Sequence, residues 1–266
     1  MPEQRLLLVE KRGEVDWVTL NRPDKLNAFN EELVEALFDY FSSLATNHSV
    51  RVVVLKANGK AFCAGLDFSP DALSAKDRTA NTVLILQKKI AEIYRAMRRC
   101  PQPIISLIHG AACGGGFSLA LASDIRIAGE SAKMNAAYIT IGLSGCDMGS
   151  SYFLPRLVGT SVASELLLTG RFIHASRALA VNLVSEIVPD SELEQAAQDF
   201  VDDMLRTSPM GLRLTKDGIN LGVDANGLDA AMAVEDRQQS LLSLTEDAQE
   251  AAAAFFSKRA PEFKNS

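Results

Sequence analysis

Hydrophobic positions in the first half of the chain predict an alternation of strands and helices. Residues 15–20 form a short strand-like run, and residues 52–55 and 104–108 are continuous apolar runs, as expected of strands that are covered on both faces. Between the first two runs, apolar residues from about Glu31 recur at the spacing of one helix face, and Asn30 is placed to cap that helix. Repeated alternation of this kind indicates an α/β fold with right-handed crossovers.

The second half of the chain has a different pattern, which is largely helical from about residue 161. Residues 191–194 (SELE) match a capping box, and Thr245 with its following acidic residues marks a helix start that runs through the alanines to about residue 256. No low-complexity linker or internal repeat separates the two halves. We expect a core of residues 1–200 and a C-terminal helical region of residues 201–266.

Composition narrows the class of protein. The 266 residues include 27 Lys and Arg against 33 Asp and Glu, a formal charge of −6, and 47% are hydrophobic. These values are ordinary for a globular protein, and the mild acidity gives no support to nucleic acid or an anionic membrane as the main partner. No apolar run approaches the about 20 residues that cross a bilayer, and the N-terminus does not match a secretory signal. We expect a soluble cytoplasmic protein.

Cysteine and histidine usage argues against a metal centre. The four cysteines contain no CxxC pair, and none of the three histidines lies at a ligand spacing from another. We therefore expect no metal site and reduced, mostly buried thiols.

Two glycine-containing segments follow the two best predicted strands. They are FCAGLD at residues 62–67 and HGAACGGGFSLALASD at residues 109–124. Glycine lets backbone N–H groups approach a ligand, and the start of a helix adds partial positive charge there. Two strand ends of this kind can form an oxyanion hole. The alternative, that the glycines serve only tight turns and close packing, stays open on spacing alone. Neither segment matches a Rossmann or Walker pattern.

Taken together, these segments resemble the crotonase (enoyl-CoA hydratase/isomerase) superfamily. The resemblance rests on NRPDKLNA at residues 21–28, the two glycine segments, and LPR at residues 154–156, in that order along essentially the whole chain. It implies an α/β spiral of ββα turns with a C-terminal helical region that mediates trimerisation, often as a dimer of trimers. It also implies an acyl-CoA thioester as substrate, with coenzyme A as part of that substrate and no separate cofactor.

The resemblance assigns roles to particular positions. The backbone N–H groups of Leu66 and Gly115 would hold the thioester oxygen as negative charge develops on it. Positions that hold the adenine and pantetheine of the substrate's coenzyme A in the family correspond to Lys25, Leu26, Ala28, Ala64 and Asp67. Phe255 and Lys258 match positions that reach the coenzyme A of a neighbouring subunit, although a solvated helix end is the plain alternative for Lys258.

The chain departs from the family pattern where hydratases carry two glutamates. Those positions hold Ser118 and Tyr138, so neither of the carboxylates that add water to the double bond is present. Tyr138 could donate a hydrogen bond to an intermediate or simply pack with its hydroxyl satisfied. Ser118 could bind substrate or water, or act as a small capping residue in the first helical turn.

Asp147 is the acidic residue nearest to where other crotonases place a working aspartate. In a half-buried loop it suits a general acid or base, and an aspartate can also attack carbon as a nucleophile. The alternative is that it caps the following helix. The polar stretch of residues 68–81 would border the acyl pocket, and its sequence does not indicate the size of the acyl group.

Three functional hypotheses follow. The preferred one is an acyl-CoA enzyme that stabilises a thioester enolate, with hydration, double-bond shift or a related lyase step and Asp147 as the acid/base. The second is a hydrolytic or dehalogenase-like enzyme in which Asp147 is the nucleophile or activates water. The third is a non-catalytic protein that keeps the fold and binds RNA, which the charge of −6 argues against.

Overall fold

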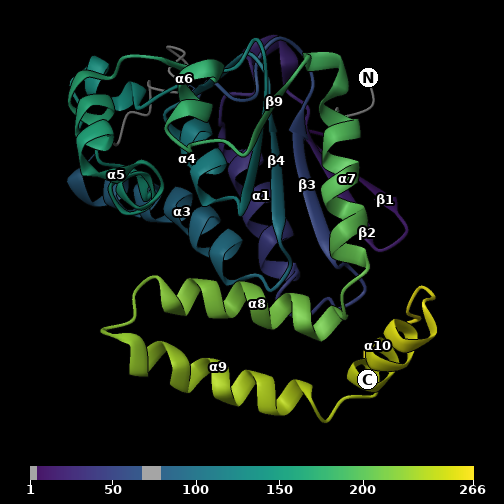
Figure 1. Cartoon of the computed structure of the whole chain (residues 1–266). Coiled ribbons are helices and arrows are strands. Elements are labelled where there is room, and N and C mark those ends of the chain that lie inside the picture. Colours follow the sequence, from purple (N-terminus) through teal and green to yellow (C-terminus); the bar gives the residue numbers. More distant parts are fainter. Residues whose placement is uncertain (1–4, 68–78) are drawn as a thin grey trace.

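The computed structural model describes residues 5–67 and 79–266 (Figure 1). Most of the polar stretch that we expect to border the acyl pocket, residues 68–78, lies outside the described residues.

A six-stranded sheet forms the centre of the molecule. Its strand order is β1-β2-β3-β4-β6-β9, with β1 antiparallel to β2 and the other neighbouring pairs parallel. The strands are β1 (Leu7–Arg12), β2 (Val15–Leu20), β3 (Val52–Ala57), β4 (Ile104–Ile108), β6 (Ile125–Gly129) and β9 (Glu186–Val188). The three strands predicted from hydrophobic runs are confirmed as β2, β3 and β4.

A smaller sheet of three short strands lies beside the first. It consists of β5 (Ala111–Cys113), β7 (Lys133–Asn135) and β8 (Ile173–His174), with β5 and β7 parallel and β8 antiparallel to β7. Because β5 leads directly into the glycine run 114–116, this sheet fixes the position of that run.

Helices cover the central sheet and form the C-terminal part of the chain (Figure 1). They are α1 (Glu31–Ser43), α3 (Ala80–Arg99), α4 (Gly115–Ala122), α5 (Ser150–Thr169), α6 (Ala175–Ala180), α7 (Leu193–Leu205), α8 (Pro209–Gly222), α9 (Leu228–Leu242) and α10 (Glu246–Ser257). Short 3₁₀ turns occur at Pro23–Lys25, Ala137–Ile141 and Asp190–Glu192. The predicted cap of α1 is confirmed, because the Asn30 side chain accepts a hydrogen bond from the Leu33 N–H at 3.1 Å.

Both faces of the inner strands of the central sheet are buried, whereas the edge strand β1 is mostly exposed. Val53 and Leu55 of β3 belong to the core beneath α1 and α3, whereas Val52 and Val54 belong to the core beneath α7. Side chains alternate between the two faces of a strand, so covering both faces requires apolar residues at every position. This explains the continuous apolar runs in the sequence. Residue 200, where we placed the domain boundary, lies within α7.

The predicted capping box at residues 191–194 is wrong. Helix α7 begins at Leu193 after a 3₁₀ turn, and its start has no side-chain cap. The Glu194 carboxylate instead pairs with Lys56 on β3 and, at 3.1 Å, with Arg12 on β1. Two cations from the sheet are a stronger attraction for this carboxylate than a local backbone N–H.

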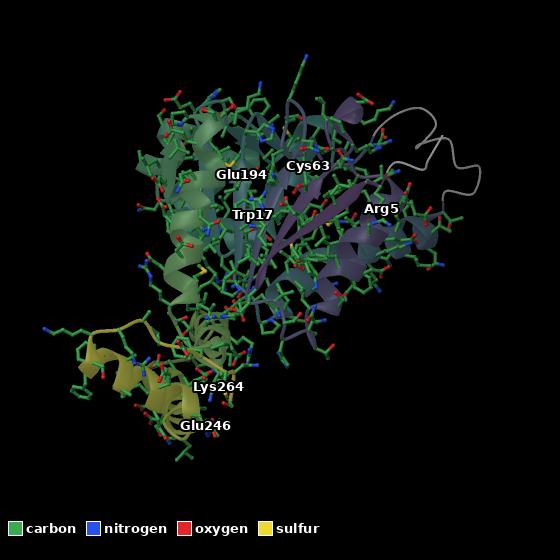
Figure 2. All side chains as sticks on the ribbon, turned by 90° about the vertical axis from the view of Figure 1, so that its right-hand side faces the viewer. Arg5, Trp17, Cys63, Glu194, Glu246 and Lys264 are labelled. Carbon is green, nitrogen blue, oxygen red and sulfur yellow. The ribbon has the colours of Figure 1, made fainter. Side chains whose placement is uncertain are left out.

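The C-terminal helices extend away from the sheet, as Figures 1 and 2 show. Helix α9 packs on α8, and α8 is tied to the core by Lys216, which is almost fully buried. The Lys216 ammonium donates to the carbonyls of Gln102 and Met97, at 2.8 and 3.1 Å, and pairs with Asp124 at 2.9 Å. The predicted helix start at Thr245 is confirmed, since its hydroxyl accepts from the Ala248 N–H at 3.1 Å.

Candidate active site

The two glycine segments lie side by side because β3 and β4 are parallel neighbours. Three backbone hydrogen bonds join the loops that follow these strands: Phe62 N–H to His109 O at 3.0 Å, Cys63 N–H to Ala111 O at 3.1 Å, and Cys113 N–H to Cys63 O at 2.9 Å. Two segments that are about 50 residues apart in sequence are thus held in fixed register.

Gly65 brings the two predicted oxyanion donors together. A Cβ atom at Gly65 would lie 2.8 Å from the Cys113 carbonyl oxygen and 3.4 Å from the Gly115 nitrogen, so only glycine allows this approach. Leu66, the next residue, therefore lies beside the start of α4. A side chain at Gly115 would itself lie 2.7 Å from the Phe29 ring.

The local backbone frees the Leu66 N–H group for a ligand. Ala64 and Asp67 both donate to the neighbouring segment, to Leu26 O at 3.0 Å and to Phe29 O at 2.9 Å. In a regular strand, N–H groups that point to one side are an even number of residues apart. Ala64 and Asp67 are three residues apart, so one extra residue is present between them. The positive φ of Gly65 (93°) supplies it, as in a bulge, and turns the Leu66 N–H out of this ladder.

The Gly115 N–H is the first of helix α4. The first N–H groups of a helix have no partner within it, and the helix dipole adds partial positive charge at the same place. The N–H groups of Leu66 and Gly115, which we call the backbone side of the site, therefore form an arrangement that suits a developing oxyanion.

Ser118 and Tyr138 meet directly. Their hydroxyl groups are 2.7 Å apart in a hydrogen bond, and both side chains are buried. Burial raises the pKa of Tyr138 above its ordinary value, so the phenol is protonated and neutral. The Ser118 hydroxyl is used in this bond rather than in a cap. The two positions where hydratases of the resembled family carry glutamates thus hold a neutral pair.

Asp147 lies in the loop before α5 and is half-buried. Its carboxylate oxygen Oδ1 accepts from the Met148 N–H at 2.8 Å and from the side-chain amide of Gln87 on α3. Burial raises the pKa of Asp147, and these two hydrogen bonds act in the opposite direction. Helix α5 begins at Ser150 after Gly149 and has no side-chain cap. Asp147 therefore bonds the residue that follows it and does not cap the helix.

Two side chains of α3 that the sequence did not single out belong to this site. The Tyr94 hydroxyl donates to the Gly115 carbonyl at 3.0 Å, and Gln87 binds Asp147. The two residues are seven apart and so share one face of the helix. Burial raises the pKa of Tyr94 well above its ordinary value, and the nearby Tyr138 and Asp147 raise it further. No local pattern marks either residue, because their partners Gly115 and Asp147 lie 21 and 60 positions away in the sequence. We call Ser118, Tyr138, Asp147, Gln87 and Tyr94 the side-chain side of the site.

The predicted coenzyme A positions fall into two places. The first group gathers on one surface, since the bond from Ala64 N–H to Leu26 O joins the segments that carry them. In this group the Asp67 carboxylate pairs with Arg22 at 2.7 Å. The other two positions, Phe255 and Lys258, belong to the α10 end of the chain, which lies far from Cys63 and the glycine segments (Figure 2). Within a single chain these two groups are not brought together.

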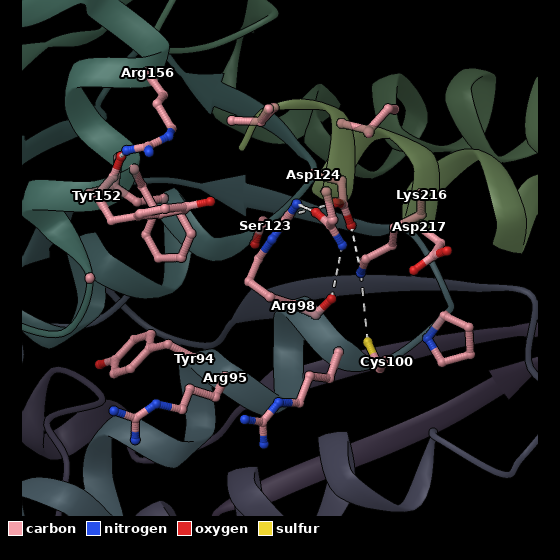
Figure 3. A pocket seen from close by; sticks show the side chains of 18 of the residues that line it. Tyr94, Arg95, Arg98, Cys100, Ser123, Asp124, Tyr152, Arg156, Lys216 and Asp217 are labelled. Atoms are coloured by element: carbon pink, nitrogen blue, oxygen red, sulfur yellow. Dashed lines mark hydrogen bonds and ion pairs between the residues drawn. The ribbon is translucent and has the colours of Figure 1, made fainter. Parts of the chain in front are cut away.

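A cavity of about 1220 Å³ lies between α3, α5 and α8 (Figure 3). Its lining includes Tyr94, Arg98, Asp124, Tyr152 and Lys216. It reaches Met148 and Gly149, directly after Asp147, but the backbone donors do not line it. The cavity therefore adjoins the candidate site near Tyr94, Met148 and Gly149, but it is not the site itself.

Neither a metal cluster nor a membrane span is present in the described part of the chain. Residues 5–67 and 79–266 contain no group of three or more His, Cys, Asp and Glu that could hold a metal ion. No helix among those same residues has the length and apolar character needed to cross a membrane.

Comparison with known proteins matches residues 10–266 to the family model described as enoyl-CoA hydratase/isomerase. The probable enoyl-CoA hydratase EchA12 of Mycobacterium tuberculosis is 38% identical over 97% of this chain and 92% of its own length. The 1,2-epoxyphenylacetyl-CoA isomerase of Escherichia coli is 31% identical over 92% of this chain and 93% of its own length.

Solved structures agree over the full fold. The crystal structure of a putative enoyl-CoA hydratase from Streptomyces coelicolor superposes with a TM-score of 0.93 at 35% identity, covering 100% of this chain and 96% of the other. An enoyl-CoA hydratase from Bacillus anthracis gives a TM-score of 0.93 at 31% identity, covering 98% of this chain and 100% of the other.

Proposed function

The chain belongs to the enoyl-CoA hydratase/isomerase (crotonase) family, and from this premise we propose that it shifts a double bond in an acyl-CoA thioester, with Asp147 as the residue that moves the proton. The family membership and the crotonase α/β fold confirm the resemblance recognised in the sequence. The substrate, the reaction and the residue roles below are the proposal.

The backbone side of the site stabilises the intermediate. When a proton leaves the carbon next to the thioester carbonyl, the negative charge moves to the carbonyl oxygen as an enolate. The N–H groups of Leu66 and Gly115 are placed to donate to that oxygen. One such donor contributes about 3–4 kcal/mol to the transition state in comparable sites.

The observation that carries the choice of reaction is the hydrogen bond between Ser118 and Tyr138. Adding water to a double bond by the two-glutamate route needs a base for the water and an acid for the carbon. Here the two hydroxyl groups bond each other, and burial keeps the phenol protonated. The pair therefore offers no base at neutral pH.

A double-bond shift needs only one carboxylate. Asp147 takes a proton from C2 of a 3-enoyl-CoA, the electrons of that C–H bond form the enolate, and the double bond between C3 and C4 is conjugated with it. Asp147 then returns the same proton to C4, and the product is the 2-enoyl-CoA. A carboxylate whose pKa is raised by burial is better matched to this exchange than one in water.

Substrate binding and assembly complete the proposal. Lys25, Leu26, Ala28, Ala64 and Asp67 hold the coenzyme A portion, and Phe255 and Lys258 reach the coenzyme A of a neighbouring subunit. Large apolar side chains stand exposed on the C-terminal helices and in the turn between α9 and α10, including Leu228 (73%), Leu244 (80%) and Phe256 (82%), which supports burial between subunits. We propose a cytoplasmic homotrimer or dimer of trimers that acts in fatty acid metabolism without a separate cofactor.

The test compares 3-enoyl-CoA and crotonyl-CoA as substrates of the unchanged protein and of Asp147→Asn. We expect isomerisation of the 3-enoyl-CoA, slow hydration of crotonyl-CoA, and a loss of isomerisation of about 10²- to 10⁴-fold in Asp147→Asn. Asp199→Asn, which changes an exposed aspartate on α7, is the matched control and should have no effect.

Two outcomes would contradict the proposal. Rapid hydration of crotonyl-CoA that survives Asp147→Asn would mean that another group activates water. A covalent acyl or aryl adduct on Asp147, detected by mass spectrometry, would select the hydrolytic or dehalogenase-like alternative instead.

A further inference from the structure

We propose that Gln87 is a positioning residue for Asp147, whose side-chain amide directs the carboxylate and accommodates it with and without the transferred proton. The inference rests on the proposed role of Asp147 in the double-bond shift. It concerns a residue that lies 60 positions away in the sequence and on a different element.

The contact is specific and comes from a helix that also supports the backbone side of the site. The Gln87 amide nitrogen donates to Oδ1 of Asp147, and the Met148 N–H donates to the same oxygen at 2.8 Å. One face of α3 therefore binds Asp147 through Gln87 and the Gly115 carbonyl through Tyr94, at 3.0 Å. This face fixes the carboxylate relative to the oxyanion donors.

Gln87 is an uncharged partner for the Asp147 carboxylate. Within residues 5–67 and 79–266, the titratable side chains that interact electrostatically with Asp147 are the phenols of Tyr94 on α3 and Tyr138 in the turn Ala137–Ile141, and burial keeps both protonated. Cys146, the preceding residue, is exposed. Gln87 supplies a hydrogen bond to this half-buried carboxylate without adding a charge.

A carboxamide can serve a group that cycles between two protonation states. It carries a donor NH₂ group and an acceptor oxygen. Toward the ionised carboxylate the NH₂ group donates, as the structure shows. Toward the protonated acid, a half turn of the amide presents its oxygen to the acid O–H. A lysine would stabilise only the ionised form, and a glutamate would disfavour it.

The strained backbone beside Asp147 agrees with this role. Met148 adopts a left-handed conformation with φ of 47°, which non-glycine residues rarely take. Two hydrogen bonds hold the loop in this conformation: the Ser150 N–H donates to the Asp147 carbonyl at 2.8 Å, and the Asp147 N–H donates to the Ser150 hydroxyl at 3.0 Å. Asp147 therefore has little conformational freedom, and Gln87 on helix α3 donates a hydrogen bond to its carboxylate.

The experiment measures the pH profile of kcat for 3-enoyl-CoA isomerisation in Gln87→Lys, Gln87→Glu and Gln87→Met. We expect the acidic limb to move to lower pH in Gln87→Lys and to higher pH in Gln87→Glu, each by about one pH unit. Gln87→Met should lower kcat by about tenfold with little change in KM, because it removes orientation without adding charge. A purely structural role would not move the limb in opposite directions.

The chain offers a matched control. Gln198 donates to Asp202 at 2.7 Å on α7, which is the same kind of pair at a distance from the site. Gln198→Lys and Gln198→Glu should leave both the profile and kcat unchanged. Gln87 is exposed, so its variants should fold, and melting curves check this.

The two proposals fail separately. If Asp147→Asn isomerises normally, the proposed function is wrong and the role of Gln87 falls with it. If Asp147→Asn is inactive but the Gln87→Lys and Gln87→Glu profiles coincide with that of the unchanged protein, or shift in the same direction, the inference about Gln87 alone is overturned.

Discussion

The backbone side and the side-chain side of the site are built on different principles. Leu66 and Gly115 contribute main-chain groups whose positions depend on the absence of Cβ atoms at Gly65 and Gly115. Ser118, Tyr138 and Asp147 contribute side chains that hydrogen bonds hold in place. Under the proposed function, stabilisation of the oxyanion would therefore depend on chain geometry, whereas the choice of reaction would depend on side chains that can be replaced.

On the backbone side, the largest expected effect comes from Gly115→Ala. The new methyl group would lie 2.7 Å from the Phe29 ring and 3.0 Å from the Tyr94 hydroxyl, so the donor must shift. We expect a loss of kcat/KM of about 10²- to 10³-fold and a loss of stability of about 1–3 kcal/mol.

Steady-state kinetics and urea unfolding measure the two losses. Gly222→Ala is the control, because a Cβ atom there meets nothing within 4 Å at the end of α8. Normal turnover in Gly115→Ala would show that this N–H is not a donor.

The pH dependence of turnover tests the side-chain side. Burial raises the pKa of Asp147, so isomerisation should fall as the pH drops through a pKa that lies above the ordinary value for aspartate. The fall approaches tenfold per pH unit below that value. If the acidic limb of the kcat profile has its midpoint at the ordinary aspartate pKa, the predicted rise in the pKa of Asp147 is wrong.

The same shift has a consequence for stability. A carboxyl group whose pKa is raised by folding favours the folded state most at low pH, and this contribution is lost as the pH rises through the raised pKa. Asp147→Asn should therefore raise the melting temperature at pH 7, and the gain should shrink toward pH 4. Melting curves at the two pH values measure it, and a lower melting temperature at pH 7 would argue against the burial cost.

Tyr138→Phe tests whether the hydrogen-bonded pair of Ser118 and Tyr138 takes part in the proton transfer. It leaves the buried Ser118 hydroxyl without its 2.7 Å partner, which costs about 1–3 kcal/mol of unfolding free energy. Because the phenol is not the base, we expect isomerisation to fall by less than about tenfold. Tyr40→Phe, which removes a 3.0 Å bond to Asp16 in the core, is the comparison for stability alone. A drop in turnover as large as that of Asp147→Asn would give Tyr138 a direct part in the chemistry.

The smallest effect concerns a residue outside both sides. If Lys258 reaches the phosphate of a neighbour's coenzyme A, Lys258→Ala should raise KM by about two- to fivefold with kcat unchanged, as for an exposed ion pair. Lys264→Ala is the nearby control. An unchanged KM at low salt would leave Lys258 as a solvated helix end.

Sequence reasoning succeeded where a local pattern decides the structure. The buried runs of β2, β3 and β4 and the caps at Asn30 and Thr245 depend on neighbouring residues, and the structure has them as expected. It failed for Glu194, because the ion pairs that compete with the capping box come from β1 and β3.

The candidate site shows the same limit. The glycine segments were visible because glycine has a distinct backbone role, and Asp147 was visible through its family position. Gln87 could not be recognised in the sequence, because its hydrogen-bond partner Asp147 lies 60 residues away.

The buried Lys216 has a consequence for how the chain folds during translation. Its ammonium is the partner of the Met97 and Gln102 carbonyls and shares Asp124 with Arg98, yet it is translated more than 90 residues after Asp124. A nascent chain that ends before residue 216 has a complete central sheet but leaves those buried carbonyls without this donor, which is costly. The core and the C-terminal helices therefore consolidate together, late in translation, and a ribosome-bound fragment that ends after α7 should be more open to proteolysis than the released protein.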